Sequence, residues 1–111
     1  MGVPLEQAKS ELFRALGHPV RIRVLELLDD GPKTVRQLLD VIAIEASRLS
    51  QQLAILRRTG LVVAQRDGNT VAYSLSTAEV TDLLRTARQV LAHRTLGQGR
   101  LLAELRLEHA S

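Results

Sequence analysis

Apolar residues recur at helical spacing along most of the chain, and Gly, Pro or Asp residues interrupt each series. The spacing predicts five helices, over residues 4–16, 19–28, 35–41, 45–58 and 77–94. Gly17 ends the first helix, and Pro19 suits the first turn of the second. Asp29–Pro32 predicts a turn before the third, and Gly60 is a natural stop for the fourth.

Three helix starts carry residues that can cap them. Thr34 and Gln37 have the three-residue spacing of a capping box, and so do Ser76 and Glu79. We expect His18 to cap the helix that begins at Pro19.

After Gly60 the period changes from helical to extended. Residues 61–65 and 71–75 predict two short strands, and Asp67-Gly68 between them is a strong hairpin signal. The predicted fold class is mainly α with a small β-hairpin wing, a winged helix-turn-helix in the order α-α-α-α-β-β-α. We predict one domain over residues 1–111, with a short helix over 101–107 and a mobile tail over 97–111.

The amino-acid composition limits which chemical groups the protein can use. The 111 residues contain no cysteine, which excludes disulfides and thiolate metal sites. Aromatic residues make up 2% of the chain, so the core must be aliphatic. No apolar run is long enough to cross a membrane, and the N-terminus lacks a signal-peptide pattern, so we expect a cytoplasmic protein with no membrane partner.

Positive charge is concentrated in the middle of the chain. The net charge is +3, and residues 31–70 hold six basic and three acidic residues. A nucleic-acid partner would produce this distribution. A solvated basic face would produce it equally well.

The fourth predicted helix has a polar face without acidic residues after Glu45. With Leu53 facing inward, Leu49 and Leu56 fall within about 60° of it at 100° per residue. The remaining polar residues of the N-terminal half can hydrogen-bond base edges and phosphates in a major groove. The candidate DNA contacts on this helix are Ser47, Arg48, Ser50, Gln51 and Gln52. An ordinary polar surface helix is the alternative.

The hairpin tip gives a second group of candidate DNA contacts. Arg66, Asn69 and Thr70 can reach backbone phosphates or a minor groove beside the fourth helix. Alternatively, Arg66 is only a solubilising charge at the end of a strand.

Three runs of sequence resemble the ArsR/SmtB family of bacterial regulators. Leu16–Leu25 is similar to the family's entry into the second helix, Ser50–Val62 to its recognition helix, and Gly68–Leu75 to its second wing strand. The resemblance covers residues 10–76 and implies a homodimeric repressor that a metal ion or another signal releases from DNA. Gln52 stands where the family often has histidine, and its amide keeps the ability to hydrogen-bond.

The resemblance also implies where metal ligands would lie. Cysteines that family members carry around the third helix correspond here to Thr34 and Arg36, which excludes a thiolate sensor at that place. A second family site corresponds to Thr77, Glu79, Val90 and His93. Of these, Glu79 and His93 can bind a metal, from opposite subunits of a dimer. Their carboxylate and imidazole favour nickel, zinc or cobalt as an effector, and no other cofactor is required. Alternatively, Glu79 is only a cap residue and His93 only complements a helix dipole.

The first and last predicted helices carry apolar stripes that a single small core cannot cover. We predict that helices 4–16 and 77–94 pair in a homodimer, which would place two recognition helices about one DNA turn apart on an inverted-repeat operator. The predicted interface residues are Leu5, Leu12, Leu16, Val80, Leu83, Leu84, Ala87 and Leu91.

The sequence gives less support to two other classes of protein, enzymes and protein-interaction modules. The sequence has no Gly-rich phosphate loop, no nucleophile elbow and no convincing Ser-His-Asp group, so we expect no enzyme activity. A winged-helix protein-interaction module would be expected to show an acidic or apolar face on the fourth helix. A regulator that does not respond to metal is a further alternative.

Overall fold

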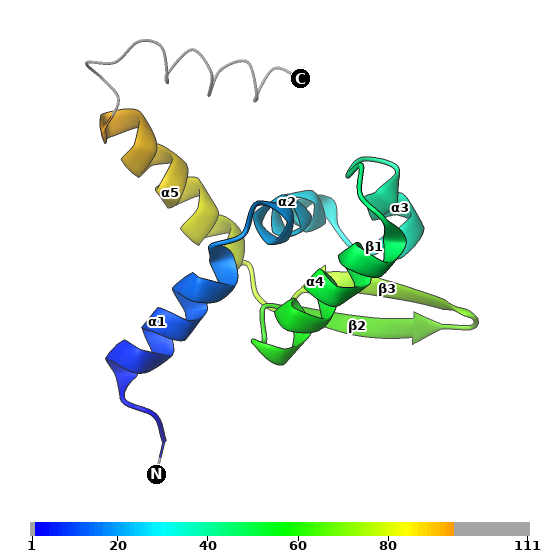
Figure 1. The fold of residues 1–111 in the computed structure, drawn as a ribbon, viewed down its shortest axis with the longest axis horizontal. Coiled ribbons are helices and arrows are strands. Elements are labelled where there is room, and N and C mark those ends of the chain that lie inside the picture. The colour runs from blue at the N-terminus through cyan, green and yellow to red at the C-terminus, as the bar shows by residue number, and fades with distance from the viewer. Residues whose placement is uncertain (1, 95–111) are drawn as a thin grey trace. The chain divides into compact units, whose positions relative to one another are not determined.

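The computed structural model describes residues 2–94, and its elements follow the predicted order with two additions, a short 3-10 helix and a two-residue strand (Figure 1). The predicted helix over 101–107 and the tail over 97–111 lie outside the described residues. In chain order the elements are α1 (Leu5–Leu16), α2 (Pro19–Leu27), the short 3-10 helix η1 (Leu28–Asp30), β1 (Lys33–Thr34), α3 (Val35–Leu39), α4 (Ala46–Arg58), β2 (Val62–Asp67), β3 (Thr70–Leu75) and α5 (Glu79–Arg94).

Side chains cap α2 and α3 as predicted. The N–H of Val20 donates to Nδ1 of His18 at 3.1 Å. At α3, the N–H of Gln37 donates to Oγ1 of Thr34 at 3.2 Å, and the N–H of Thr34 donates to Oε1 of Gln37 at 2.9 Å. This reciprocal pair satisfies two backbone donors at the start of a helix only five residues long.

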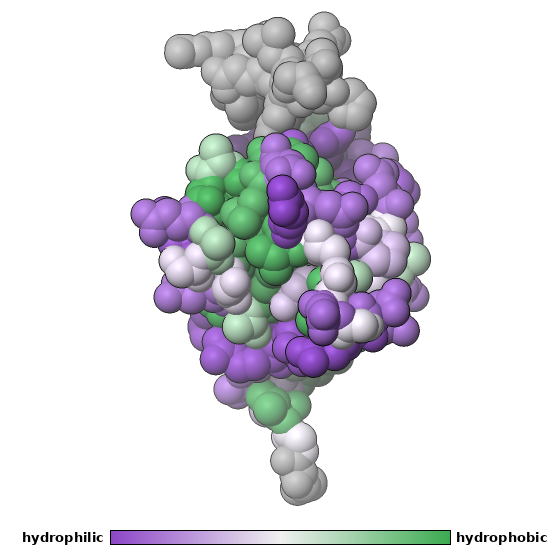
Figure 2. All heavy atoms as spheres, turned by 90° about the vertical axis from the view of Figure 1, so that its right-hand side faces the viewer, coloured by the Kyte–Doolittle hydropathy of each residue, from purple (hydrophilic) through white to green (hydrophobic). Residues whose placement is uncertain are grey.

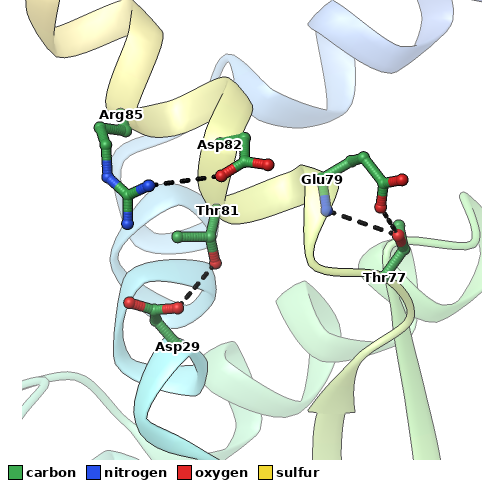
Figure 3. A network of polar contacts seen from close by, with 6 residues as sticks. All are labelled: Asp29, Thr77, Glu79, Thr81, Asp82 and Arg85. Carbon is green, nitrogen blue, oxygen red and sulfur yellow. Dashed lines mark hydrogen bonds and ion pairs between the residues drawn. The ribbon is translucent and has the colours of Figure 1, made fainter.

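The predicted capping role of Ser76 is wrong. Helix α5 begins at Glu79, and it is Thr77 whose hydroxyl contacts the carboxylate of Glu79 and accepts from its N–H at 3.4 Å (Figure 3). Because the helix begins later than predicted, the nearby hydroxyl that reaches Glu79 belongs to Thr77. The backbone N–H of Ser76 instead donates to the carbonyl of Leu61 at 3.0 Å.

Helix α4 ends in a Schellman motif that turns the chain into the sheet. The N–H of Leu61 donates to the carbonyl of Leu56, and that of Gly60 to Arg57, both at 3.0 Å. Gly60 adopts a φ of 78°, which residues with a Cβ rarely adopt. Leu56 and Leu61 are both buried, as expected for the apolar contact that accompanies this motif.

The sheet has three antiparallel strands in the order β1-β3-β2. Asp67 pairs with Thr70, which leaves the two-residue turn Gly68-Asn69 at the tip of the wing. Only Gly68 of this turn has a positive φ, at 64°, the pattern of a type II′ hairpin turn. The unpredicted strand β1 pairs Lys33 with Tyr73 and leads directly into α3.

An aliphatic core holds the helices and the sheet together, as the composition requires. The side chains that are less than 2% exposed are Val24, Leu25, Leu38, Leu49, Leu53 and Leu56. Three of these belong to α4, which therefore lies in a fixed orientation against α2, α3 and β2.

The chain divides between Thr81 and Asp82 into two units. The first contains α1 through β3 and the start of α5, and the second contains the rest of α5. The single domain over residues 1–111 stays a prediction. Among the described residues, every helix is too short or too polar to span a bilayer.

Candidate nucleic-acid interface

Helix α4 presents a polar face to solvent, and its opposite side packs in the core. Leu49, Leu53 and Leu56 are buried, as predicted. The predicted contacts Ser47, Arg48, Ser50 and Gln51 are all exposed. The leucines that anchor the helix therefore leave a row of hydroxyl, guanidinium and amide groups facing outward.

Two exposed arginine side chains of this surface have no acidic partner within residues 2–94. The side chains of Arg48 on α4 and Arg66 on β2 make no hydrogen bond or ion pair with any other described residue. The first turn of α4 contains no acidic residue. The positive charge at the start of α4 and on the wing is thus available to an anionic partner.

Gln52 differs from its neighbours on α4. It is half-buried, and its Oε1 accepts a hydrogen bond from Nη1 of Arg21 at 2.8 Å. Arg21 lies on α2 and was not among the predicted site residues. Its only signal in the sequence was its place within the family-like run that opens α2.

The wing extends beyond α4 to one side of the first unit (Figure 1). Arg66, Asn69 and Thr70 are exposed at its tip, as their predicted role requires. Figure 2 shows that hydrophilic residues dominate the face on this side of the molecule, around a smaller hydrophobic patch. The geometry leaves both α4 and the wing open to a large polar partner.

The four positions that correspond to the family's second metal site do not form a complete set of ligands. The hydroxyl of Thr77 contacts Glu79, and Val90 carries no ligand atom. The hydrogen bond from Thr77, and next the backbone N–H of Glu79, lower the pKa of the Glu79 carboxyl below its ordinary value. Within the described residues, no three His, Cys, Asp or Glu side chains gather as a metal site would need. Glu79 and His93 are the two ligand-type residues at these positions.

The predicted dimer residues fall into two groups. Leu16 and Val80 are 7% and 4% exposed within one chain, so they belong to its core and offer little surface to a partner. Leu12, Leu83 and Leu84 are half-buried, and Leu5, Ala87 and Leu91 are exposed. The interface prediction omitted two large exposed residues, Phe13 on α1 at 57% and Val90 on α5 at 59%.

Helices α3 and α4 with a hairpin directly after them, and a polar recognition face that remains free, define the class of winged helix-turn-helix proteins. A model of the bacterial regulatory proteins of the arsR family matches residues 18–63. An uncharacterized HTH-type transcriptional regulator of Mycobacterium tuberculosis, Rv0081, is 45% identical over 104 residues, covering 93% of this chain and 91% of the relative. The regulator NmtR of the same organism is 40% identical over 85 residues, and the match covers 77% of this chain and 71% of NmtR.

Solved structures agree with this assignment. The crystal structure of Rv0081 matches with a TM-score of 0.77 at 47% identity, covering 86% of this chain and 96% of that one. A second match is the solution structure of the homodimeric winged helix-turn-helix DNA-binding domain of Mb0332 from Mycobacterium bovis. Its TM-score is 0.74 at 25% identity, and the match covers 82% of this chain and 85% of that one. The chain belongs to the ArsR/SmtB family of bacterial transcription regulators. This confirms the predicted fold class, and it makes the chain a regulator and not an enzyme.

Proposed function

We propose that this protein is a sequence-specific regulator that binds an inverted-repeat operator in duplex DNA as a homodimer in the cytoplasm. Helix α4 enters the major groove, and the wing contacts the adjacent backbone. The residues that contact DNA are Ser47, Arg48, Ser50, Gln51, Gln52, Arg66, Asn69 and Thr70.

One observation carries this proposal: the exposed face of α4. Its N-terminal half presents Arg48 and Gln51, the residue types that hydrogen-bond guanine and adenine edges, on a helix held rigidly by three buried leucines. An acidic or apolar face at this place would favour a protein partner.

Two observations support the homodimer. The winged helix-turn-helix domain of Mb0332 is homodimeric. In this chain, α1 exposes Leu5 at 67% and Phe13 at 57%, and α5 exposes Val90 at 59%. Large apolar side chains grouped on a helix surface are typical of an interface between subunits.

Selection from a randomised duplex library with the purified protein tests the proposal. We expect the bound sequences to share an inverted repeat whose half-sites lie about one helical turn, or roughly 10 base pairs, apart. Sedimentation of the complex should give two chains for each duplex. If the protein bound all duplexes of the library equally, with the same dependence on salt, the result would contradict sequence-specific binding.

We further propose that the effector is not a metal ion bound at the family's second site. Val90 carries no ligand atom, and the hydroxyl of Thr77 is a poor ligand that already contacts Glu79, so two of the four positions add little to Glu79 and His93. Titration with nickel, zinc or cobalt should therefore leave the affinity for the operator unchanged at stoichiometric metal. Release of DNA by one of these ions, abolished in His93→Ala, would show a metal-responsive regulator instead.

A further inference from the structure

Arg21 joins three elements of the fold through one guanidinium group. Its Nε donates to the carbonyl of Ala15 at 2.6 Å, and its Nη2 donates to the carbonyl of Arg14 at 3.2 Å. Both carbonyls belong to the last turn of α1, and that of Arg14 also accepts from the N–H of Gly17 at 3.1 Å. Its Nη1 donates to Oε1 of Gln52 on α4 at 2.8 Å.

The chemistry of arginine determines which way the Gln52 amide points. A guanidinium group has only donors, so the atom that faces Arg21 must be the amide oxygen, and the NH₂ group must point away. Nε2 of Gln52 has no partner among the described residues. Those residues contain no buried side-chain nitrogen or oxygen without a partner, so Nε2 reaches solvent.

We propose that Arg21 is a positioning residue for DNA recognition, which holds Gln52 so that it presents only hydrogen-bond donors to DNA. A free glutamine pairs with adenine by accepting from N6 and donating to N7. With Oε1 held by Arg21, Gln52 favours a base edge that offers acceptors alone. Guanine, with O6 and N7 side by side in the major groove, offers such an edge.

This inference rests on the proposed function and deepens it, because it assigns a base preference to one residue of α4. Library selection on the wild type, Gln52→Glu and Arg21→Met tests it. The base pair whose preference changes in Gln52→Glu identifies the position that Gln52 faces. We expect guanine there in the wild type.

The two substitutions should change this preference in different ways. Glutamate at position 52 still accepts from Arg21 but has no donor, so the preferred base should change from guanine to cytosine, whose N4 donates. In Arg21→Met the amide is free to rotate, and the preference for guanine over adenine should fall about tenfold. A merely structural role of Arg21 would weaken binding to all sequences and leave this preference intact.

Arg23→Met is the matched control, because Arg23 is exposed on the same helix and its side chain makes no hydrogen bond or ion pair with a described residue. It should keep the wild-type preference. If Arg21→Met does not fold, the wild type and Gln52→Glu together still decide, since a freely rotating glutamine would favour adenine over guanine at the position that Gln52→Glu identifies.

The outcomes separate the inference from the proposed function. A wild type that selects no common sequence would overturn both. A wild type that selects an operator but prefers adenine at the Gln52 position would overturn only the role of Arg21. Two other results would also overturn only the role of Arg21. One is an unchanged base preference in Arg21→Met, and the other is a Gln52→Glu variant whose affinity falls equally for all sequences.

Discussion

Neighbouring polar residues of α4 have different roles because the helical period places each side chain in a different environment. Arg48 and Gln51 point into solvent, whereas Gln52, one residue further on, is half-buried and bonded to Arg21. The helical period predicted the first two correctly as exposed. It could not predict the partner of Gln52, because Arg21 lies 31 residues earlier in the chain.

Replacing either of two exposed side chains on α4 should weaken operator binding without loss of the fold. Arg48→Ala and Gln51→Ala each remove hydrogen-bond donors from the recognition face, and each should cost about 1–3 kcal/mol of specific binding free energy. Fluorescence anisotropy with the selected operator measures the loss. Lys9→Ala, on the exposed surface of α1, removes one positive charge elsewhere and is the control. Wild-type affinity in both α4 variants would contradict the assigned face.

The contact between Thr77 and Glu79 should be visible in a titration. Its hydrogen bond favours the charged carboxylate, so the NMR titration midpoint of Glu79 should lie below 4.5. Because the folded pKa is lowered, the stabilisation of the first turn of α5 is present above 4.5 and is lost as the pH falls through the lowered value.

Two variants of Thr77 provide the control for this titration. Thr77→Val removes the hydroxyl and should raise the pKa of Glu79 toward its ordinary value, while Thr77→Ser keeps the hydroxyl and should keep the low pKa. Equal midpoints in both variants would show that Thr77 does not cause the shift.

Among the elements, the wing depends most on local sequence signals. Asp67-Gly68 predicted the hairpin, and the structure places a tight turn at Gly68-Asn69. The strands run to the turn itself, so Arg66 lies on a paired strand and not in a loop. Pairing limits the backbone freedom of this cation and holds it at the tip of the wing.

A charge held in this way should act on the DNA backbone and not on particular bases. Arg66→Ala should lower affinity for all duplexes and reduce the slope of log K against log salt by about one unit. Binding measured at several salt concentrations tests this for the operator and for a scrambled duplex. Gln65→Ala, at the exposed neighbouring position, should leave the slope unchanged. A loss confined to the operator would mean that Arg66 reads bases.

At the scale of the whole molecule, α1 and α5 both expose large apolar side chains. Neither helix contributes many buried residues: α1 buries Ala15 and Leu16, and α5 buries Val80. Exposed large apolar side chains on both helices are costly in water and would be covered at a two-fold interface.

A charge on α5 should separate the subunits. Leu84→Glu places a carboxylate at a predicted interface position, where burial without a partner is strongly unfavourable. Sedimentation should show a monomer that keeps its helical circular dichroism and binds the operator weakly. Thr86→Glu adds the same charge at an exposed position of α5 and should stay dimeric. A dimeric Leu84→Glu variant with wild-type affinity would refute this interface.

The order of the helices, the hairpin, the caps at His18 and Thr34 and the outward face of α4 were all predictable from the amino-acid sequence. These features follow from residues within a few positions of one another, through helical period, capping spacing and turn chemistry. Three other features became visible in the folded chain: β1 joins β3, Leu16 and Val80 belong to the core, and Arg21 holds Gln52. Strand β1 has two residues, too few for any alternating pattern, and its pairing exists only because β3 lies beside it. The cap of α5 was predicted only in part. The sequence has the spacing of a capping box at Ser76 and Glu79, but α5 begins at Glu79, so the hydroxyl that contacts Glu79 is that of Thr77.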